Sequence, residues 1–152
     1  MDIDQATNAR YGRIVLGIYA AINAVTMIGA AIALWVLSAR ANHRGIDPNT
    51  SVGFRTQRTL ASLRGWYAAQ RVGFHFAAIS TTVITVVVLV ALVALLRRRK
   101  LWWIVPVPIV GGIAIGVVMI IAGQRAEHAA ITVERPAATS AAPGAPHPGT
   151  HQ

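Results

Sequence analysis

Three stretches of the chain are apolar and contain no charged side chain: residues 14–37, 74–96 and 101–122. Each is longer than the roughly 20 residues that an α-helix needs to cross the hydrocarbon core of a bilayer. A secretory signal has an apolar region of only about 7–15 residues, so the first stretch is predicted to be a retained anchor. The pattern predicts an all-α integral membrane protein with three transmembrane helices, and it excludes a water-soluble globular fold.

The polar segment between the first two spans, residues 38–73, is long enough to carry structure of its own. Turn-forming residues such as Asp47 and Pro48 predict a loop in its first part. Residues 53–73 have helical periodicity and predict an interfacial amphipathic helix lying in the headgroup region. The i, i+4, i+7, i+11 spacing predicts that one face of this helix carries Arg55, Thr59, Ser62 and Trp66.

The two ends of the chain and the connection between the second and third spans are polar. Residues 1–13 precede the first span, and four adjacent cations, Arg97 to Lys100, form a minimal turn before the third. Dense positive charge in a short loop favours the cytoplasmic side, so we expect the N-terminus and this turn in the cytoplasm. Residues 123–152 are polar and rich in proline towards the end, which predicts a largely disordered tail.

Charge and hydrophobicity are segregated along the chain. The net charge is +9, with 14 Lys+Arg against 5 Asp+Glu, although 55% of the residues are hydrophobic. Arginines interleaved with aromatics in residues 38–73 resemble a nucleic-acid surface, but no nucleic-acid module fits their spacing. Because they flank membrane spans, contact with lipid phosphates is the better interpretation, and no direct nucleic-acid partner is expected. The residues predicted to contact lipid headgroups are Arg64, Arg71, Arg97, Arg98, Arg99 and Lys100.

Components for catalysis are scarce. None of the five carboxylates falls within a span, and the histidines form no H-E-x-x-H motif. The chain has no cysteine, which removes disulfides, thiol chemistry and thiolate metal ligands. We therefore expect no catalytic residue, no bound metal, no cofactor and no enzymatic activity.

Small and polar side chains occur within the spans. Six of them are expected to hydrogen-bond to neighbouring helices or to their own backbone, namely Asn23, Thr26, Ser80, Thr81, Thr82 and Thr85. Gly112 and Gly116 form a G-x-x-x-G pair, which permits close helix packing either within one chain or in a homo-oligomer.

The loop between the first two spans contains a motif of specific spacing, N-x-x-x-G-x-R-T-x-x-T-x-x-S-x-x-x-W. Here the motif runs from Asn49 to Trp66, with Gln57 at a position where proline is frequent. The motif, and the order of one span, a motif loop and two further spans, resemble the SdpI-type immunity family. By motif position, the residues that the resemblance marks for recognition are Asn49, Gly53, Arg55, Thr56, Thr59, Ser62 and Trp66.

The resemblance implies a multi-pass protein of the bacterial cytoplasmic (inner) membrane that protects the cell from a secreted toxin peptide. It also implies capture of a transcriptional repressor when the toxin is present. Two other functions stay open, namely a structural accessory subunit of a larger membrane complex and a lipid-binding membrane regulator.

The residue types of the motif make physical sense without catalysis. Gly53 permits a positive φ, Thr56 is a suitable helix N-cap, and Arg55 offers a planar fork of donors to a carboxylate, phosphate or carbonyl. Arg55 and its neighbours either recognise a ligand or hold the loop against the helices, and the sequence does not decide between the two.

Overall fold

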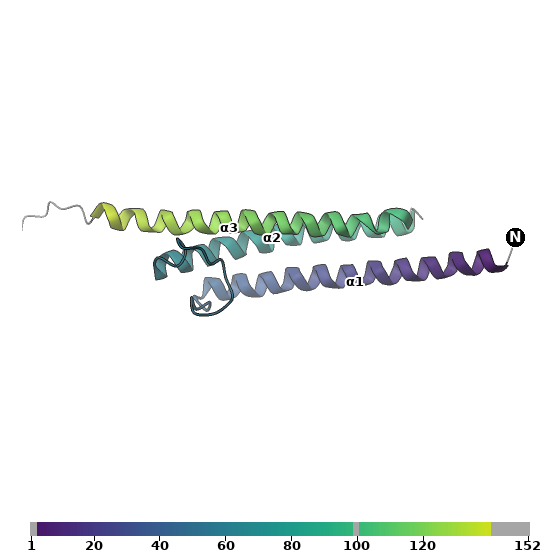
Figure 1. Ribbon diagram of the computed structural model, residues 1–152, viewed down its shortest axis with the longest axis horizontal. Helices are drawn as coiled ribbons and strands as arrows, with labels where there is room; N and C mark the ends of the chain where they lie inside the picture. Colours follow the sequence, from purple (N-terminus) through teal and green to yellow (C-terminus); the bar gives the residue numbers. More distant parts are fainter. Residues whose placement is uncertain (1–2, 99–100, 141–152) are drawn as a thin grey trace, which may run out of the picture.

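Three long helices make up most of the described part of the chain. The computed structural model describes the backbone of residues 3–98 and 101–140, and the side chains of residues 10–98 and 102–134. The elements, in chain order, are α1 (Ile3–Asn42), α2 (Leu63–Arg97), the short 3₁₀ helix η1 (Leu101–Ile104) and α3 (Pro106–Ser140). The three long helices run side by side, and α2 packs against both α1 and α3 (Figure 1).

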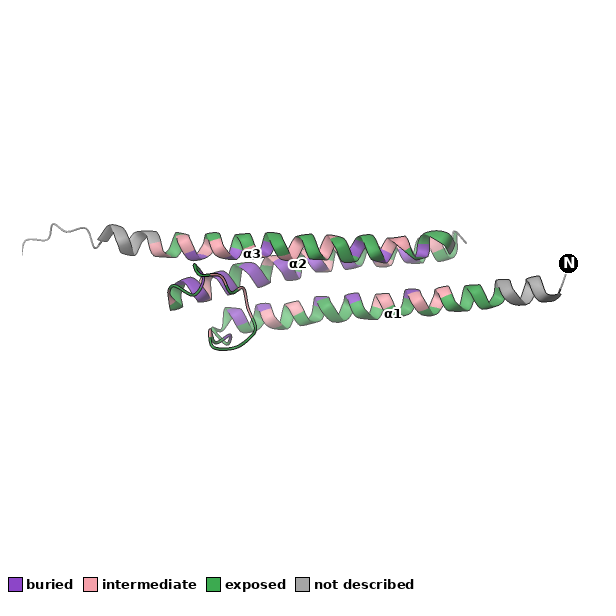
Figure 2. Ribbon diagram, in the orientation of Figure 1, coloured by how far each residue is buried: buried purple, intermediate pink, exposed green. Residues whose placement is uncertain are grey.

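All three long helices are long and apolar enough to cross a membrane. The predicted spans at residues 14–37 and 74–96 each lie within one helix, and the span at 101–122 begins in η1 and continues in α3. Much of the helix surface is exposed (Figure 2). Large apolar side chains on that surface include Val25, Ile32, Val83, Val90, Ile113 and Ile120. A water-soluble protein rarely exposes apolar patches of this extent, whereas a bilayer solvates them.

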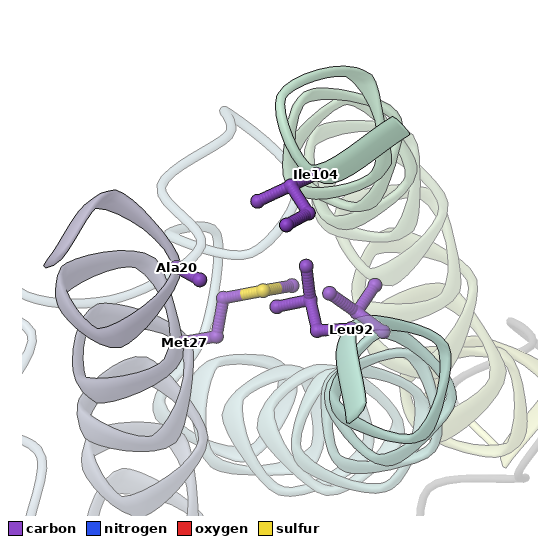
Figure 3. Packing of buried hydrophobic residues seen from close by; sticks show 5 residues of the cluster. Ala20, Met27, Leu92 and Ile104 are labelled. Carbon is purple, nitrogen blue, oxygen red and sulfur yellow. The ribbon is translucent and has the colours of Figure 1, made fainter. Parts of the chain in front are cut away.

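A small apolar core holds the helices together away from the loop end. Met27 of α1 points towards Leu92 of α2, and η1 contributes Ile104, whose side chain is fully buried (Figure 3). Val88 of α2 belongs to the same cluster. A Cβ added to Gly111 of α3 would lie 2.7 Å from Val88 Cγ2 and 3.0 Å from Met27 Cε. The close approach of α3 to this core therefore requires glycine at position 111.

Gly112 and Gly116 have no such role in the described part of the chain. Both are exposed, and a Cβ at either position would meet no atom within 4 Å. Their G-x-x-x-G pair faces away from α1 and α2, and its use in a homo-oligomer stays a prediction.

Three polar side chains within the spans bond to their own helix, as expected, but the prediction fails for Thr81 and Thr85. Asn23 Nδ2 donates to the Tyr19 carbonyl at 2.9 Å, and the Thr26 and Thr82 hydroxyls donate to carbonyls four residues earlier at 2.9 and 2.8 Å. Two buried α2 hydroxyls, those of Thr81 and Thr85, have no hydrogen-bond partner within the described residues.

The predicted interfacial helix is absent, and this part of the fold prediction was wrong. The chain from residue 43 to Ser62 is a loop, and α2 begins at Leu63 and continues to Arg97 without interruption. Residues 63–73 are therefore the first turns of the second membrane helix. The face expected for Arg55, Thr59, Ser62 and Trp66 does not exist, since the first two lie in the loop and Ser62 is the N-cap of α2.

The third helix extends well beyond the predicted span. Residues from 123 onwards are predicted to be a disordered tail, but α3 remains helical to Ser140, and residues 141–152 lie outside the described part of the chain. Ala126 and Ala130 of this extension are fully buried with Ala69 of α2. A second small core thus forms at the loop end. In the sequence, its α3 alanines are spaced four residues apart among polar residues.

Candidate functional site

The motif loop folds back onto α2 through a pair of hydrogen bonds to one buried side chain. The Phe54 backbone N–H donates to Gln70 Oε1 at 2.9 Å, and Gln70 Nε2 donates to the Phe54 carbonyl at 3.2 Å. The Gln70 side chain is fully buried in the first turns of α2. The Gln70 side-chain amide thereby satisfies both the N–H and the carbonyl of Phe54, which have no partner in a helix or sheet.

Gly53 has the positive φ that the sequence predicts, with a value of 134°. A Cβ at this position would lie 2.8 Å from both Gln70 Oε1 and Trp66 Cη2. Both the backbone conformation and the lack of space therefore select glycine at the point where the loop meets α2.

Two threonines close a single turn after Phe54. The fully buried Thr59 hydroxyl donates to the Phe54 carbonyl at 2.7 Å and accepts from the Thr56 N–H at 2.9 Å. In return, the Thr59 N–H donates to the Thr56 hydroxyl at 3.2 Å. Thr56 thus caps one isolated turn, and its predicted role as the N-cap of a long helix was wrong, because the chain leaves the turn before Ser62.

Trp66 holds the first half of the loop against α2. Its indole is 1% exposed and donates from Nε1 to the Ile46 carbonyl at 2.8 Å. Ala41, Ile46, Trp66 and Phe74 form one apolar cluster, and the Phe54 ring lies 5.0 Å from that of Phe74. Trp66 is consequently a structural anchor of the loop.

Arg55 lies on the outside of the loop. Its Nη1 donates to the Pro48 carbonyl at 3.0 Å and to the Thr50 carbonyl. No hydrogen bond within the described residues uses Nε or Nη2, and the residue is exposed. Asn49 lies in the segment that Arg55 bridges, and its backbone N–H donates to Asp47 Oδ1 at 2.7 Å. Arg55 thus braces residues 48–50 and still presents unused guanidinium donors to the surroundings.

Ser62 links the start of α2 to the extension of α3. Its hydroxyl accepts from the Gly65 N–H at 3.0 Å and donates to Glu134 Oε1 at 2.7 Å. The first turn of α2 contains no acidic residue of its own. Because a helix N-terminus carries partial positive charge, the Glu134 carboxylate supplies the complement that α2 lacks.

An ion pair joins the motif loop to the same extension of α3. Arg58 Nε lies 3.4 Å from Glu127 Oε1, with the two side chains 65% and 36% exposed. An exposed pair of this kind is worth at most about 1 kcal/mol. The buried alanines Ala69, Ala126 and Ala130 and the Ser62–Glu134 hydrogen bond join the first turns of α2 to the extension of α3.

The residues predicted to contact lipid headgroups divide between the two ends of the bundle. Arg64 and Arg71 are exposed at the loop end of α2, and Arg97 and Arg98 are exposed at its opposite end. The remaining two, Arg99 and Lys100, lie outside the described residues.

Sequence reasoning missed several residues that hold the loop in place. Gln70 was not singled out, and Glu127 and Glu134 fell in the segment predicted to be a tail. Two signals were available, because Ala122, Ala126 and Ala130 recur every fourth residue and carboxylates are rare in this chain. Within the described part of the chain, no group of three or more histidine, cysteine or acidic residues could hold a metal ion.

The architecture defines the class: a three-helix membrane protein whose first connection is a hydrogen-bonded loop held between α2 and α3. The chain belongs to the SdpI/YfhL protein family, whose model matches residues 45–122. The match covers the loop, α2, η1 and the apolar part of α3, which together make up just over half of the chain. No curated protein and no solved structure matches the chain.

Proposed function

We propose that this protein is an immunity-type membrane protein that protects a bacterial cell against a secreted antimicrobial peptide. Membership of the SdpI/YfhL family, over a region that begins at Gly45 and includes the whole motif loop, carries the proposal. The carboxylates in and beside the loop are already engaged, which favours recognition over catalysis. Asp47 accepts from the Asn49 N–H, and Glu127 and Glu134 are held by Arg58 and Ser62.

The proposed contact surface is the outer side of the loop, around Arg55 and Asn49. Both residues are exposed, while Thr59, Trp66 and Gln70 beneath them are buried and hydrogen-bonded. A guanidinium held by two backbone carbonyls loses little freedom when its remaining donors meet a peptide carboxylate or carbonyl. The buried motif residues then act by shaping the loop, and Arg55 acts by contacting the toxin.

The proposal includes an orientation and a relay. With the N-terminus inside, the motif loop faces the outside of the cell, where a secreted peptide arrives. A transcriptional repressor would then meet the opposite end of the bundle, where Arg97 and Arg98 are exposed. The cytoplasmic (inner) membrane of a bacterium is the location that fits both contacts.

Replacing Arg55 tests the proposed site. A sensitive bacterial host is made to express the protein and is challenged with a panel of secreted toxin peptides. We expect Arg55→Ala to lower the protective effect by about tenfold or more in the toxin concentration that halves growth, a loss equivalent to about 1.4 kcal/mol of binding.

Arg58→Ala is the matched control, because it removes the same charge from the same loop and costs only an exposed ion pair. Protection by Arg58→Ala should stay within about twofold of the wild type. Membrane abundance and melting temperature are measured for both variants. Unchanged protection by Arg55→Ala, at normal abundance, would overturn the site.

A further inference from the structure

A shallow hollow of about 420 Å³ lies at the loop end of the bundle. It is on the side of α2 away from Trp66, Gln70 and Phe74, which contact the loop. It is bounded by residues from all three long helices. Those that matter here are Asn42 of α1, Arg71, His75, Phe76 and Ile79 of α2, and Arg125 of α3. The hollow therefore exists only when the three helices are assembled.

Its upper part is cationic and partly preorganised. The Arg125 guanidinium lies over the Phe76 ring, 4.2 Å from the ring centroid, and Arg71 is exposed on the neighbouring turn of α2. His75 packs edge-on against Trp35, with ring centroids 6.0 Å apart. Among the described residues, no carboxylate lines the hollow. Two guanidinium groups, an imidazole and an amide around one recess are suited to a phosphate.

The side of the hollow nearer the membrane span is lined by the apolar residues Phe76 and Ile79. Ile79 lies within the uncharged stretch of residues 74–96, and Val83 follows one helical turn later. A second, separate hollow of about 380 Å³ lies between α2 and α3. It starts at Val83, extends to Trp103 of η1 and is lined by apolar residues that include Val110 and Ala114. Phe76, Val83 and Val87 are spaced i, i+7 and i+11, so they share one helix face. A cationic recess is thus followed by an apolar slot at membrane depth.

We propose that these two hollows form a binding site for one anionic phospholipid. The phosphate lies between Arg71 and Arg125, and an acyl chain occupies the slot between α2 and α3. Charge complementarity selects an anionic headgroup over a zwitterionic one. The order of the two hollows along α2 selects a lipid over a free anion. The inference does not depend on the proposed toxin recognition.

The test uses the full-length protein in nanodiscs of phosphatidylcholine with and without phosphatidylglycerol. Bound lipid is counted by native mass spectrometry, and melting temperature is measured in parallel. We expect one retained phosphatidylglycerol per chain and a higher melting temperature in its presence. The double substitution Arg71→Gln/Arg125→Gln should weaken this retention by about tenfold or more.

The chain offers a closely matched control in Arg40→Gln/Arg44→Gln, two exposed arginines that do not line the hollow. This pair removes the same charge at the same end, and it also removes a cation–π contact, because Arg44 lies 5.7 Å from the Tyr67 ring centroid. The control should change retention by less than about twofold. Equal losses in the two doubles would show diffuse attraction to the membrane and would overturn the site. If the Arg125 change unfolds the protein in phosphatidylcholine, Arg71→Gln alone replaces the double substitution. This variant breaks no described contact and should also weaken retention of phosphatidylglycerol.

Two further arms separate a lipid from a free anion. Ala114→Trp fills the apolar slot without changing charge, and it should also weaken retention of phosphatidylglycerol. Inorganic phosphate, added to the protein in phosphatidylcholine, should leave the melting temperature unchanged. If phosphate alone reproduces the stabilisation, or if Ala114→Trp retains the lipid as the wild type does, the phospholipid assignment is wrong.

Discussion

Gly53 controls how the motif loop meets α2, since its backbone conformation turns the chain so that Phe54 can pair with Gln70. The sequence predicts the positive φ here because few other residue types adopt one without strain. The partner could not be predicted, because nothing local distinguishes Gln70 from a solvent-exposed glutamine. Its burial depends on the return of the loop to α2 at Phe54, which is a tertiary effect.

Gly53→Ala should therefore destabilise the protein strongly. The new methyl group would collide with Gln70 and Trp66 and would force a strained φ, so we expect a loss of more than about 2 kcal/mol in the free energy of unfolding. Gly112→Ala is the control, since it adds the same methyl group to an exposed helical position with nothing within 4 Å. The free energy of unfolding of both variants is measured in mild detergent, with circular dichroism reporting the loss of helix. Equal stability of the two variants would contradict the role of Gly53.

The extension of α3 contacts the motif loop through Phe54, which packs against its buried alanines, and through the Arg58–Glu127 ion pair. The spans were predictable from the sequence because uncharged apolar length is an unambiguous signal. The end of α3 was not, since Ala126 and Ala130 resemble the alanines of a flexible tail until α2 provides Ala69 opposite them. The wrong prediction of an interfacial helix has a related cause. Spacing alone cannot show that the side chains of Thr59 and Gln70 both donate to the Phe54 carbonyl and so replace a helical hydrogen bond there.

Enlarging a buried alanine of this extension should release the loop. Ala126→Leu overfills the contact with α2, and we expect a loss of about 1–3 kcal/mol together with faster tryptic cleavage at the loop arginines. Gln124→Leu adds a leucine at an exposed position two residues away and should leave both properties near those of the wild type. Wild-type cleavage of Ala126→Leu would show that the extension does not hold the loop.

At the scale of the whole molecule, the loop and the extension of α3 lie at one end of the bundle, and the start of α1 lies towards the other (Figure 1). An odd number of spans requires these two ends to be on opposite sides of a membrane. The absence of native cysteine makes this arrangement directly measurable.

Single cysteines at Ser51, Gln124 and Tyr11 should report the orientation. In intact cells, we expect a membrane-impermeant maleimide to label the first two and to label Tyr11→Cys only after the membrane is opened. Labelling of Ser51→Cys and Gln124→Cys from different sides would contradict the fold. Labelling of Tyr11→Cys alone in intact cells would reverse the orientation and place the motif loop in the cytoplasm.

The continuous helix α2 also sets the depth of the loop. With the hydrocarbon core beginning at Phe74, the turns from Leu63 to Phe74 rise about 16 Å above it at 1.5 Å per residue. Phe54, which packs on Phe74, then lies at the edge of the hydrocarbon, while Ser62 stands clear of the headgroups. The loop therefore crosses the layer in which amphipathic peptides adsorb, so such a peptide would reach Arg55 by diffusing in two dimensions along the bilayer surface.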